Sequence, residues 1–297
     1  MLSGHLGHLR LPTSHGEAGA VLDRHNRRVK LFGLRAADIP ADCVPEIFRA
    51  CRCGGCQFSK ITVYALPGDA QCWRDMGFRR EGTICGFFPA HIGAEIWAAY
   101  PEAKRSVEHG KGESEATLAI ARHKETSPAR LEDGYHCRRC RPPDAAEISR
   151  LMLGTFREYA CEITPESVAR NISDGRNLFR AVFDGQGEMV AVASAEIDRV
   201  HSAAELTDCV VAPRHRHRGL MRFILSRLET DTVHRLGIED LYSLARSRET
   251  GMNCDLSMLS FEYTGRLVNN CRMPLGWESM NIWCKRVRRP DASPRTD

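Results

Sequence analysis

The stretch Val210–Met221, which reads VVAPRHRHRGLM, decides how the second half of this chain folds. An apolar run that starts at Leu206 ends at Pro213, and proline cannot continue a central strand because it has no backbone N–H. Five consecutive basic residues follow, and Gly219 then opens a run whose apolar residues recur at helical spacing. The stretch therefore predicts a strand, a basic turn and the N-terminus of a helix.

The predicted turn has the chemistry of a phosphate site. The first backbone N–H groups of a helix have no partner within the helix, and the helix dipole adds partial positive charge there. Arg216, His217 and Arg218 would place basic side chains beside these groups. The whole chain has a net charge of only +4, so this local excess favours a small polyanion, such as a coenzyme, over nucleic acid. The alternative is a solvated basic turn before an ordinary surface helix.

The same turn resembles the acetyl-CoA pyrophosphate loop of the GNAT superfamily of N-acetyltransferases, whose usual form is Arg/Gln-x-x-Gly-x-Gly/Ala. His217 stands where the superfamily often has glycine, and Met221 stands where it has a small residue. Histidine tolerates a left-handed backbone better than most residues. The resemblance implies that acetyl-CoA binds to a loop made of Arg216, His217, Arg218, Gly219, Leu220 and Met221.

Length and composition indicate a globular protein. A chain of 297 residues with 42% hydrophobic residues is long enough for two domains. No apolar run is long enough to span a membrane, and the first residues contain no continuous hydrophobic segment of a secretory signal. We therefore expect a soluble cytoplasmic protein that binds neither membrane nor nucleic acid. The sequence leaves the oligomeric state open, and a homodimer is compatible with it.

Thirteen cysteines raise the question of a metal site, and two clusters stand out: Cys51-Arg-Cys53-Gly-Gly-Cys56 and Cys137-Arg-Arg-Cys140. They could form one zinc site if the two segments met in space. The second couplet, however, falls on an expected strand, where residues three apart point to opposite faces. We expect no metal and, without an export signal, no disulfide bonds.

Composition divides the chain into two compact halves. Residues 101–133 are polar and contain few large apolar side chains, so they are expected to form a linker outside any core, helical in part between 114 and 123. Residues 1–20 lack a periodic pattern and are expected to be loose. For the N-terminal domain, residues 21–100, the patterns predict strands at 27–34, 60–65, 79–87 and around Trp97, and helices at 43–53 and 70–76.

Residues 134–288 have a clear order of elements, followed by a tail at 289–297. Their patterns predict β-α-α-β-β-β-α-β-α-β-β, with a capped helix start at Thr164 and a helix end at Gly237. This order is the one known for GNAT domains. We therefore expect an α/β (α+β) protein whose C-terminal half is a GNAT acetyltransferase domain.

The N-terminal domain echoes the back part of that fold. Its strand patterns place three residues in positions that correspond to three of the second half, pairing Phe78 with Phe261, Gly82 with Gly265 and Trp97 with Trp283. We expect a smaller, degenerate GNAT-like α/β domain, which binds no coenzyme because it has no basic glycine loop. The alternative is chance similarity between two strand-helix-strand units.

Acetyl transfer to an amine needs a base, because the pKa of a lysine-like ammonium is about 10.4 and few such groups are neutral near pH 7. Glu205 lies six residues before Val211. By resemblance, this is the position of the glutamate base in the histone-acetylating branch of the superfamily. In a regular strand Thr207 shares the face of Glu205, whereas Asp208 lies on the opposite face. The alternative for Glu205 is a solvated carboxylate at a strand end.

The resemblance also implies further coenzyme contacts. Three main-chain N–H groups would meet the thioester oxygen and the pantetheine arm, those of Val210, Val211 and Ala212. Asn253 matches the asparagine of the family's second coenzyme motif. Superfamily members often carry a tyrosine acid a few residues after that asparagine, but this chain has none until Tyr263. The identity of the general acid therefore stays open.

Three segments carry a closer resemblance, to bacterial and archaeal β-lysine N6-acetyltransferases: AELTDCVVAPRHRHRGLM, SLARSRETGMN and GRLVNNCRMPLGWESMNIWCK. The likeness continues more weakly to about residue 22. That family acetylates the terminal amine of β-lysine, which lysine 2,3-aminomutase makes from lysine, to give the compatible solute Nε-acetyl-β-lysine. The resemblance implies β-lysine as the substrate, a functional link to lysine 2,3-aminomutase and a role in osmoadaptation.

A diamine acid needs a cationic or amide group for its carboxylate and acidic groups for its second amine. Candidates for the first role are Arg246, Asn269 and Asn270, and candidates for the second are Asp208 and Glu278. Each of the five also fits a purely structural role.

Without the resemblance, the residues indicate only an amine acetyltransferase. Its substrate could then be lysine, a polyamine or a protein amine. The alternative from a different class is a non-catalytic acyl-CoA-binding module, which His217 and the missing tyrosine would favour.

Overall fold

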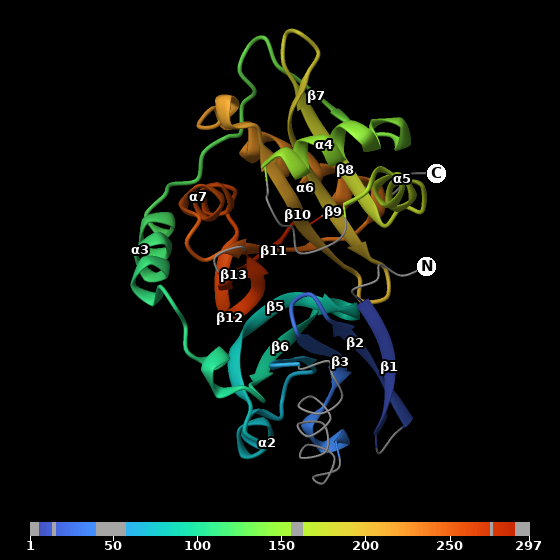
Figure 1. Cartoon of the computed structure of the whole chain (residues 1–297), viewed down its shortest axis with the longest axis vertical. Helices are drawn as coiled ribbons and strands as arrows, with labels where there is room; N and C mark the ends of the chain where they lie inside the picture. Colours follow the sequence, from blue (N-terminus) through green and yellow to red (C-terminus); the bar gives the residue numbers. More distant parts are fainter. Residues whose placement is uncertain (1–5, 14–15, 40–57, 156–162, 274–275, 289–297) are drawn as a thin grey trace, which may run out of the picture.

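The computed structural model describes residues 6–13, 16–39, 58–155, 163–273 and 276–288 (Figure 1). The described N-terminal half contains strands β1 (Leu6–Thr13), β2 (Gly16–Asp23), β3 (Arg28–Leu34), β4 (Lys60–Ala65), β5 (Arg79–Phe88) and β6 (Ile92–Ala99), and helix α2 (Ala70–Asp75). The strands and the short helix expected from residue 27 onward are confirmed. The helix expected at 43–53 lies outside the described residues.

The first strands correct one expectation. Residues 1–20 were expected to be loose, but β1 and β2 form an antiparallel hairpin whose register runs from Leu6 opposite Asp23 to Thr13 opposite Gly16. β2 in turn pairs with β3. Backbone hydrogen bonds hold such a hairpin against an existing sheet edge, so it needs no hydrophobic periodicity of its own.

The C-terminal half contains β7 (His136–Arg139), α4 (Ala145–Thr155), α5 (Pro165–Ser173), β8 (Asn177–Phe183), β9 (Met189–Asp198), β10 (Ala203–Val211), α6 (Leu220–Leu236), β11 (Asp240–Arg246), α7 (Thr250–Met258), β12 (Glu262–Met273) and β13 (Gly276–Arg286). The expected order of strands and helices is confirmed. Thr164 caps α5 through its side chain, and Gly237 ends α6 in a left-handed conformation, as expected.

The described strands form one sheet in the order β1-β2-β3-β4-β6-β5-β12-β13-β11-β10-β9-β8-β7. Neighbouring strands are antiparallel except β3 with β4 and β10 with β11, which are parallel. The two halves of the chain meet in the middle, where β5 lies beside β12 (Figure 1).

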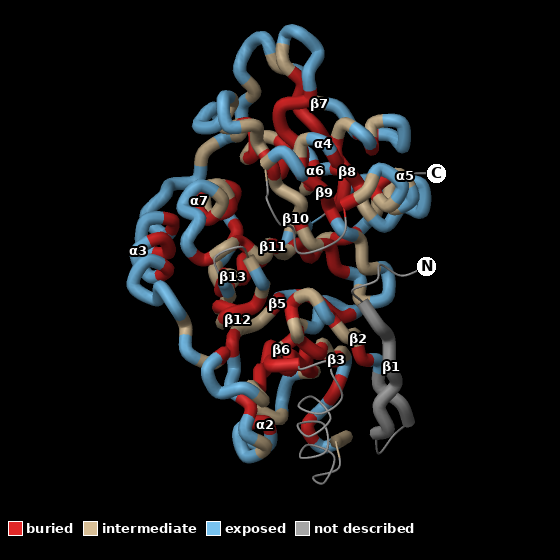
Figure 2. The backbone as a smooth tube through the Cα atoms, viewed as in Figure 1, coloured by how far each residue is buried: buried red, intermediate tan, exposed pale blue. Residues whose placement is uncertain are grey.

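Helices cover the two faces of the C-terminal part of the sheet unequally. Helix α6 and its neighbour α7 pack on one face, around a core that includes Leu206, Ile224 and Leu256. Helices α4 and α5 cover the other face, but only at the β8–β9 end. The uncovered rest of that second face is turned toward the N-terminal half, where Ala203 and Ile282 share a core with Phe87. Figure 2 shows buried stretches of strand in both halves.

The polar segment 101–133 was expected to stay outside any core, and this expectation is wrong. It contains a 3-10 turn η3 (Ala103–Ser106) and helix α3 (Lys111–Arg122). Leu118 and Ala121 of α3 are buried in the core that α6 and α7 cover, while the opposite side of α3 is exposed (Figure 2). A helix can pack on an existing core through a few apolar side chains on one face. The overall composition of a polar segment does not show that such a face exists.

The two halves share one arrangement of strands. In the N-terminal half a parallel pair, β3 with β4, is followed by β6 and β5; in the C-terminal half the parallel pair β10 with β11 is followed by β13 and β12. Gly82 and Gly265 lie opposite each other where β5 meets β12. A Cβ atom on Gly265 would lie 2.3 Å from the Cα of Gly82, so the backbones meet more closely than any side chain would allow. The origin of the N-terminal half as a degenerate copy stays a prediction.

The described residues contain neither a cluster of side chains that could hold a metal ion nor a helix that could span a membrane. Cys137 is half-buried and Cys140 buried, and no group of three or more His, Cys, Asp or Glu side chains in the described ranges could hold a metal ion. The cysteines at 51–56 lie outside those ranges. No described helix is both long enough and apolar enough to cross a membrane.

Candidate active site

A row of three polar side chains crosses the uncovered face of the C-terminal half. Glu205 of β10 lies opposite Glu196 of β9 and opposite Tyr242 of β11. Ala204 and Leu206 on either side of Glu205 belong to the core under α6, so Glu205 points to the other face, toward the N-terminal half. Its carboxylate accepts a hydrogen bond from the Tyr242 hydroxyl.

The strands β10 and β11 separate just beyond this row. They pair only over three positions, from Ala203 opposite Asp240 to Glu205 opposite Tyr242, although β10 continues to Val211. Beyond the last pair, no strand of the described ranges pairs with β10 on its β11 side. Such a gap between parallel strands leaves room for an extended ligand that hydrogen-bonds to the exposed main chain of β10.

A β-bulge follows Glu205 and changes the expected position of Asp208. Asp208 has a left-handed backbone with φ of +54°, and the β9–β10 register shifts between Thr207 and Val210. Its Oδ2 accepts a hydrogen bond of 2.7 Å from the Ser194 hydroxyl. Ser194 lies on the same face as Glu196, two residues along β9. Asp208 therefore lies on the face of Glu205, and the expectation that it lies on the opposite face is wrong because a bulge breaks strict alternation.

The environment of Glu205 makes it a stronger base than an ordinary glutamate. Burial raises its pKa to about 7, and the negative charges of Glu196 and Asp208 act in the same direction. Lys30 of the N-terminal half and the hydrogen bond from Tyr242 act in the opposite direction. Near neutral pH a large fraction of Glu205 is therefore ionised and able to accept a proton.

Only one of the three expected main-chain donors points into the gap. The Ala212 N–H donates to the Val190 carbonyl at 2.8 Å, so this part of the prediction is wrong. Val210, opposite Val192, belongs to the same alternating set and also turns its N–H toward β9. Val211 lies between them, so its N–H points away from β9 and into the gap between β10 and β11.

The basic loop has the backbone that the sequence predicted. His217 and Gly219 both adopt left-handed conformations, with φ of +63° and +69°, and Gly219 caps the N-terminus of α6. The exposed Arg216 donates through Nε to the Val211 carbonyl at 3.3 Å, and Arg218 forms a 3.0 Å ion pair with Glu132. Leu220 and Met221, also expected in the coenzyme loop, bury their side chains, so only their backbone can face a ligand.

Asn253 is part of the protein interior and not of an open coenzyme site. Its side-chain amide donates to the carbonyls of Arg246 and Glu249, and its oxygen accepts hydrogen bonds from Asn281 and Trp283. These four bonds use the hydrogen-bonding capacity of the side chain. The expectation of a direct coenzyme contact by the Asn253 side chain is therefore wrong, and this residue instead ties the start of α7 to β11 and β13.

Two of the expected substrate residues bind each other. Arg246 forms ion pairs with Glu278, at 2.8 Å, and with Glu249, at 3.2 Å. The second carboxylate oxygen of Glu278 is buried, and Arg248 Nε lies 3.8 Å from it. Arg246 is thus already neutralised, which makes it a poor receptor for a substrate carboxylate.

Asn269 and Asn270 are buried in the junction between the halves. The Asn269 amide donates to the carbonyls of Arg105 and Val107, and the Arg105 guanidinium in turn donates to the carbonyls of Asn269 and Asn270. Arg105 also lies 3.7 Å from the centre of the Trp277 ring. Burial lowers the pKa of Arg105 to about 9. These contacts assign Asn269 and Asn270 to the packing of η3 on β12, which the sequence did not reveal.

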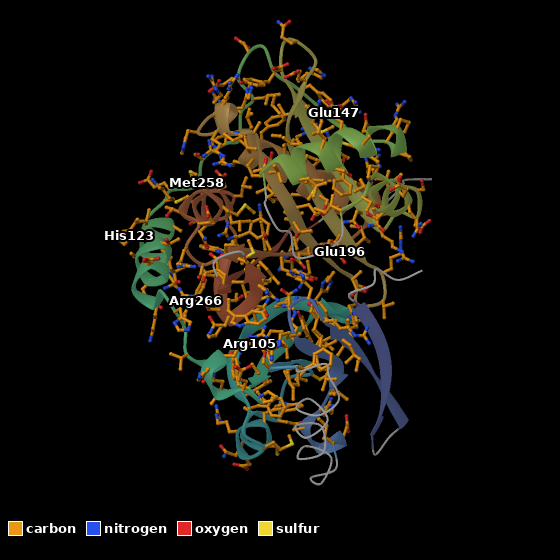
Figure 3. The ribbon with its side chains drawn as sticks, in the orientation of Figure 1. Arg105, His123, Glu147, Glu196, Met258 and Arg266 are labelled. Atoms are coloured by element: carbon orange, nitrogen blue, oxygen red, sulfur yellow. The ribbon has the colours of Figure 1, made fainter. Side chains whose placement is uncertain are left out.

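The N-terminal half covers one end of the polar row with aromatic rings. Phe87 lies 6.1 Å from the Tyr242 ring and 4.8 Å from the ring of His201, in the β9–β10 turn. Tyr64 stacks on Phe32 nearby, and burial raises the pKa of its hydroxyl. Both halves therefore surround Glu205, and Glu196 lies where they face each other (Figure 3).

Sequence reasoning missed Tyr242 and Glu196. Tyr242 was placed correctly on a strand, but its position beside Glu205 depends on the register of two strands that are not adjacent in sequence. Burial raises the pKa of Tyr242 well above its ordinary value, so it stays protonated and acts as a hydrogen-bond donor. Tyr263, the alternative considered for a general acid, packs edge-on against Trp283 in the core on the other face.

This geometry fits acetyl-CoA. The Val211 N–H points into the gap beside β10, and the N-terminus of α6 lies beside Arg216, so both could donate to an extended ligand that carries phosphates. A family model described as "Acetyltransferase (GNAT) family" matches residues 145–251, which contain both features. A β-lysine N(6)-acetyltransferase of Methanosarcina mazei is 30% identical over 251 residues, which cover 77% of this chain and 92% of that protein. The chain belongs to the GNAT family of acetyltransferases.

A second curated relative agrees with this assignment. N-acetyltransferase YodP of Bacillus subtilis is 30% identical over 273 residues, which cover 90% of this chain and 96% of that protein. Among solved structures, ribosomal-protein-S5-alanine acetyltransferase from Vibrio fischeri aligns with a TM-score of 0.46 and 13% identity, over 54% of this chain and 97% of that one. The family model confirms the expected GNAT fold of the C-terminal half, and the Methanosarcina mazei protein confirms the resemblance to β-lysine N6-acetyltransferases.

Proposed function

We propose that this GNAT enzyme transfers the acetyl group of acetyl-CoA to the N6 amine of β-lysine and so forms Nε-acetyl-β-lysine. The observation that carries the proposal is the extent of the similarity to the Methanosarcina mazei protein, which is named for this activity. The 251 aligned residues are more than the C-terminal half contains, so the likeness reaches into the half that faces Glu205.

The residues around the gap have distinct roles in this proposal. Acetyl-CoA supplies an acyl group activated as a thioester. The N–H groups at the start of α6, with Arg216 and Arg218, hold its phosphates, and the Val211 N–H holds the end of its pantetheine arm.

Glu205 is the proposed general base. In its carboxylate form it removes a proton from the N6 ammonium, directly or through one water, so that the amine nitrogen carries a free electron pair. The Tyr242 hydroxyl donates to the Glu205 carboxylate and holds its orientation. The amine nitrogen then attacks the thioester carbonyl and the carbon–sulfur bond breaks. Since Tyr242 is a very weak acid here, the coenzyme A thiolate that leaves takes its proton from water or from the amine.

The product also suggests a place for the enzyme in the cell. We propose that it acts in the cytoplasm after a lysine 2,3-aminomutase and that Nε-acetyl-β-lysine serves as a compatible solute. Cells that carry both genes should accumulate the acetylated product at high salt, and deletion of either gene should abolish it. Accumulation that does not depend on the aminomutase would contradict this role.

The activity can be tested by thiol release from acetyl-CoA with β-lysine, α-lysine, spermidine or no amine. We expect release with β-lysine to exceed release with each of the others by at least tenfold in kcat/KM. Equal or greater release with spermidine would move the assignment to a polyamine acetyltransferase. Binding of acetyl-CoA without release in any arm would instead favour an acyl-CoA-binding module.

A further inference from the structure

A lysine of the N-terminal half faces the catalytic row. On β3, Val29 and Leu31 pack into the N-terminal core, so Lys30 and Phe32 point to the opposite face. The Phe32 ring stacks on that of His201, with 5.7 Å between ring centroids. This contact fixes the Lys30 face of β3 against the β9–β10 hairpin, which carries two of the three residues of the polar row.

Lys30 lies within electrostatic reach of Glu205 and Glu196. The charge of Arg28 and burial lower the pKa of Lys30, and the carboxylates of Glu205 and Glu196 act in the opposite direction. Conversely, Lys30 lowers the pKa of Glu196, while burial and Asp208 raise it. These groups thus form one cluster of mixed charge, contributed by both halves of the chain.

Lys30 and Glu196 are accessible and have no direct partner. Protein atoms surround both side chains, which is why burial shifts their pKa values, but each still contacts solvent: Lys30 is partly exposed and Glu196 is exposed. Neither forms a hydrogen bond or an ion pair with another described residue. Other charged groups at the junction are paired: Lys60 with Glu81 at 2.7 Å, and Arg28 with Asp23 at 2.8 Å. A cation and an anion that stay unpaired beside a catalytic base can each receive an opposite charge from a ligand.

The spacing of this cluster matches a diamine acid. Directly opposite residues on neighbouring strands are about 5 Å apart, so Glu196 stands about 5 Å from Glu205 across the face. In β-lysine, three methylene groups separate the N6 amine from the carbon that carries the second amine. One methylene group separates that carbon from the carboxylate. A substrate whose N6 amine meets Glu205 therefore brings its second amine to Glu196 and its carboxylate toward the N-terminal half.

We infer that Lys30 and Glu196 determine the specificity of the amine site: Lys30 binds the substrate carboxylate, and Glu196 binds the ammonium group that is not acetylated. The inference rests on the proposed function and adds a binding role for the N-terminal half. It also replaces Arg246 as the expected receptor of the substrate carboxylate, because Glu278 and Glu249 neutralise Arg246.

Three amines separate the two contacts. β-Lysine has both the carboxylate and the second amine, 1,4-diaminopentane lacks the carboxylate, and 6-aminohexanoate lacks the second amine. The full chain and its Lys30→Met and Glu196→Gln variants are assayed with each amine by thiol release. Turnover of β-lysine by the unaltered chain tests the proposed function separately, before any variant is compared.

We expect Lys30→Met to raise KM for β-lysine and 6-aminohexanoate by about 10- to 100-fold more than KM for 1,4-diaminopentane, the range of a hydrogen bond to a charged group. Glu196→Gln should raise KM for β-lysine and 1,4-diaminopentane by a similar factor over that for 6-aminohexanoate. Lys30→Arg should recover part of the affinity because it keeps the charge.

Matched controls are Lys124→Met and Glu188→Gln, which change exposed residues after α3 and in the β8–β9 turn. Acetyl-CoA affinity and thermal unfolding of all variants check that the fold is intact. Equal losses with all three amines would overturn the inference, because Lys30 and Glu196 would then act only through Glu205 or through the fold. Unchanged KM values for β-lysine in both variants would overturn it as well.

Discussion

The two parallel strand pairs of this molecule differ in how far they stay together. In the N-terminal half β3 and β4 pair over six positions, from Arg28 opposite Lys60 to Leu34 opposite Ala65. In the C-terminal half β10 and β11 pair over three and then separate. The strands beside the two pairs follow a corresponding order, with β6 and β5 after β4 and with β13 and β12 after β11. The same strand order can therefore give a closed parallel pair or an open one.

The difference has a local cause. In β10 the bulge at Asp208 interrupts the strand where it would otherwise continue alongside β11. The β3–β4 register also shifts, between Phe32 and Leu34, but this pair stays together, and Ile61 and Val63 of β4 remain buried in the N-terminal core. The closed pair turns Lys30 and Phe32 of β3 toward the open pair, and Phe87 of β5 contacts the same β9–β10 turn through His201. The C-terminal half therefore contributes Glu196, Glu205 and Tyr242, and the N-terminal half packs against the face that carries them.

The strongest test of the open pair is Glu205→Gln. Loss of a general base typically costs 10²- to 10⁴-fold, so we expect kcat to fall by about that factor while acetyl-CoA affinity stays within about twofold. Steady-state kinetics and calorimetric titration measure the two quantities, with Glu188→Gln as the exposed control. A variant that keeps full turnover would show that Glu205 is not the base.

A smaller effect is expected where the halves meet. A Cβ on Gly265 would lie 2.3 Å from the Glu81 carbonyl oxygen, whereas the nearest atoms to a Cβ on Gly82 lie at 2.8 Å. Gly265→Ala should therefore lower the free energy of unfolding by about 2–4 kcal/mol, and Gly82→Ala by less. Urea unfolding measures both. Gly112→Ala, in α3 with open space around it, is the control and should not destabilise.

The next effect is the dependence of kcat on pH, which reports the protonation of Glu205. The pKa of Glu205 is raised to about 7 by burial, with Glu196 and Asp208 adding to the rise and Lys30 and Tyr242 opposing it. Since the ionised form is the base, kcat should rise with pH through about 7 and fall about tenfold per pH unit below it. Rates measured between pH 5 and 9 test this. An inflection near the ordinary glutamate value would contradict the enclosed environment of Glu205.

The smallest predicted effect concerns the loop. His217 holds a left-handed backbone, which costs alanine about 1–2 kcal/mol and glycine nothing. We expect His217→Ala to weaken acetyl-CoA binding about 5- to 30-fold. His217→Gly should bind within about twofold of the unaltered chain or more tightly, because glycine is the usual residue of such loops. Equal weakening in both variants would mean that the imidazole itself contacts the coenzyme.

The parts of the fold that follow local rules could be predicted. The order of strands and helices in the C-terminal half depends on periodicity, caps and turn residues, which are all local. The basic loop could be found because consecutive residues form it. Segments without hydrophobic periodicity were predicted wrongly. The hairpin β1–β2 is attached to β3, and α3 packs on the core under α6 and α7, so both depend on contacts with other parts of the chain.

The candidate site divides in the same way. Glu205 and the loop from Arg216 to Gly219 were named from the sequence, because a motif of consecutive residues places them. Asp208 was assigned to the wrong face and Asn253 to the wrong role, because one depends on a bulge and the other on four hydrogen bonds to distant residues. Tyr242 and Glu196 join Glu205 only through strand register.

By itself, the sequence determined the order of elements in the C-terminal half, where the basic loop lies and which family the chain resembles. Only the tertiary structure decided that the strands part after Glu205, that the Val211 N–H points into the gap and that Lys30 faces the carboxylates. The physical reason is that propensity, capping and loop chemistry act between neighbours in the chain. Burial, register and charge act between neighbours in space, and those neighbours exist only after the halves have packed together.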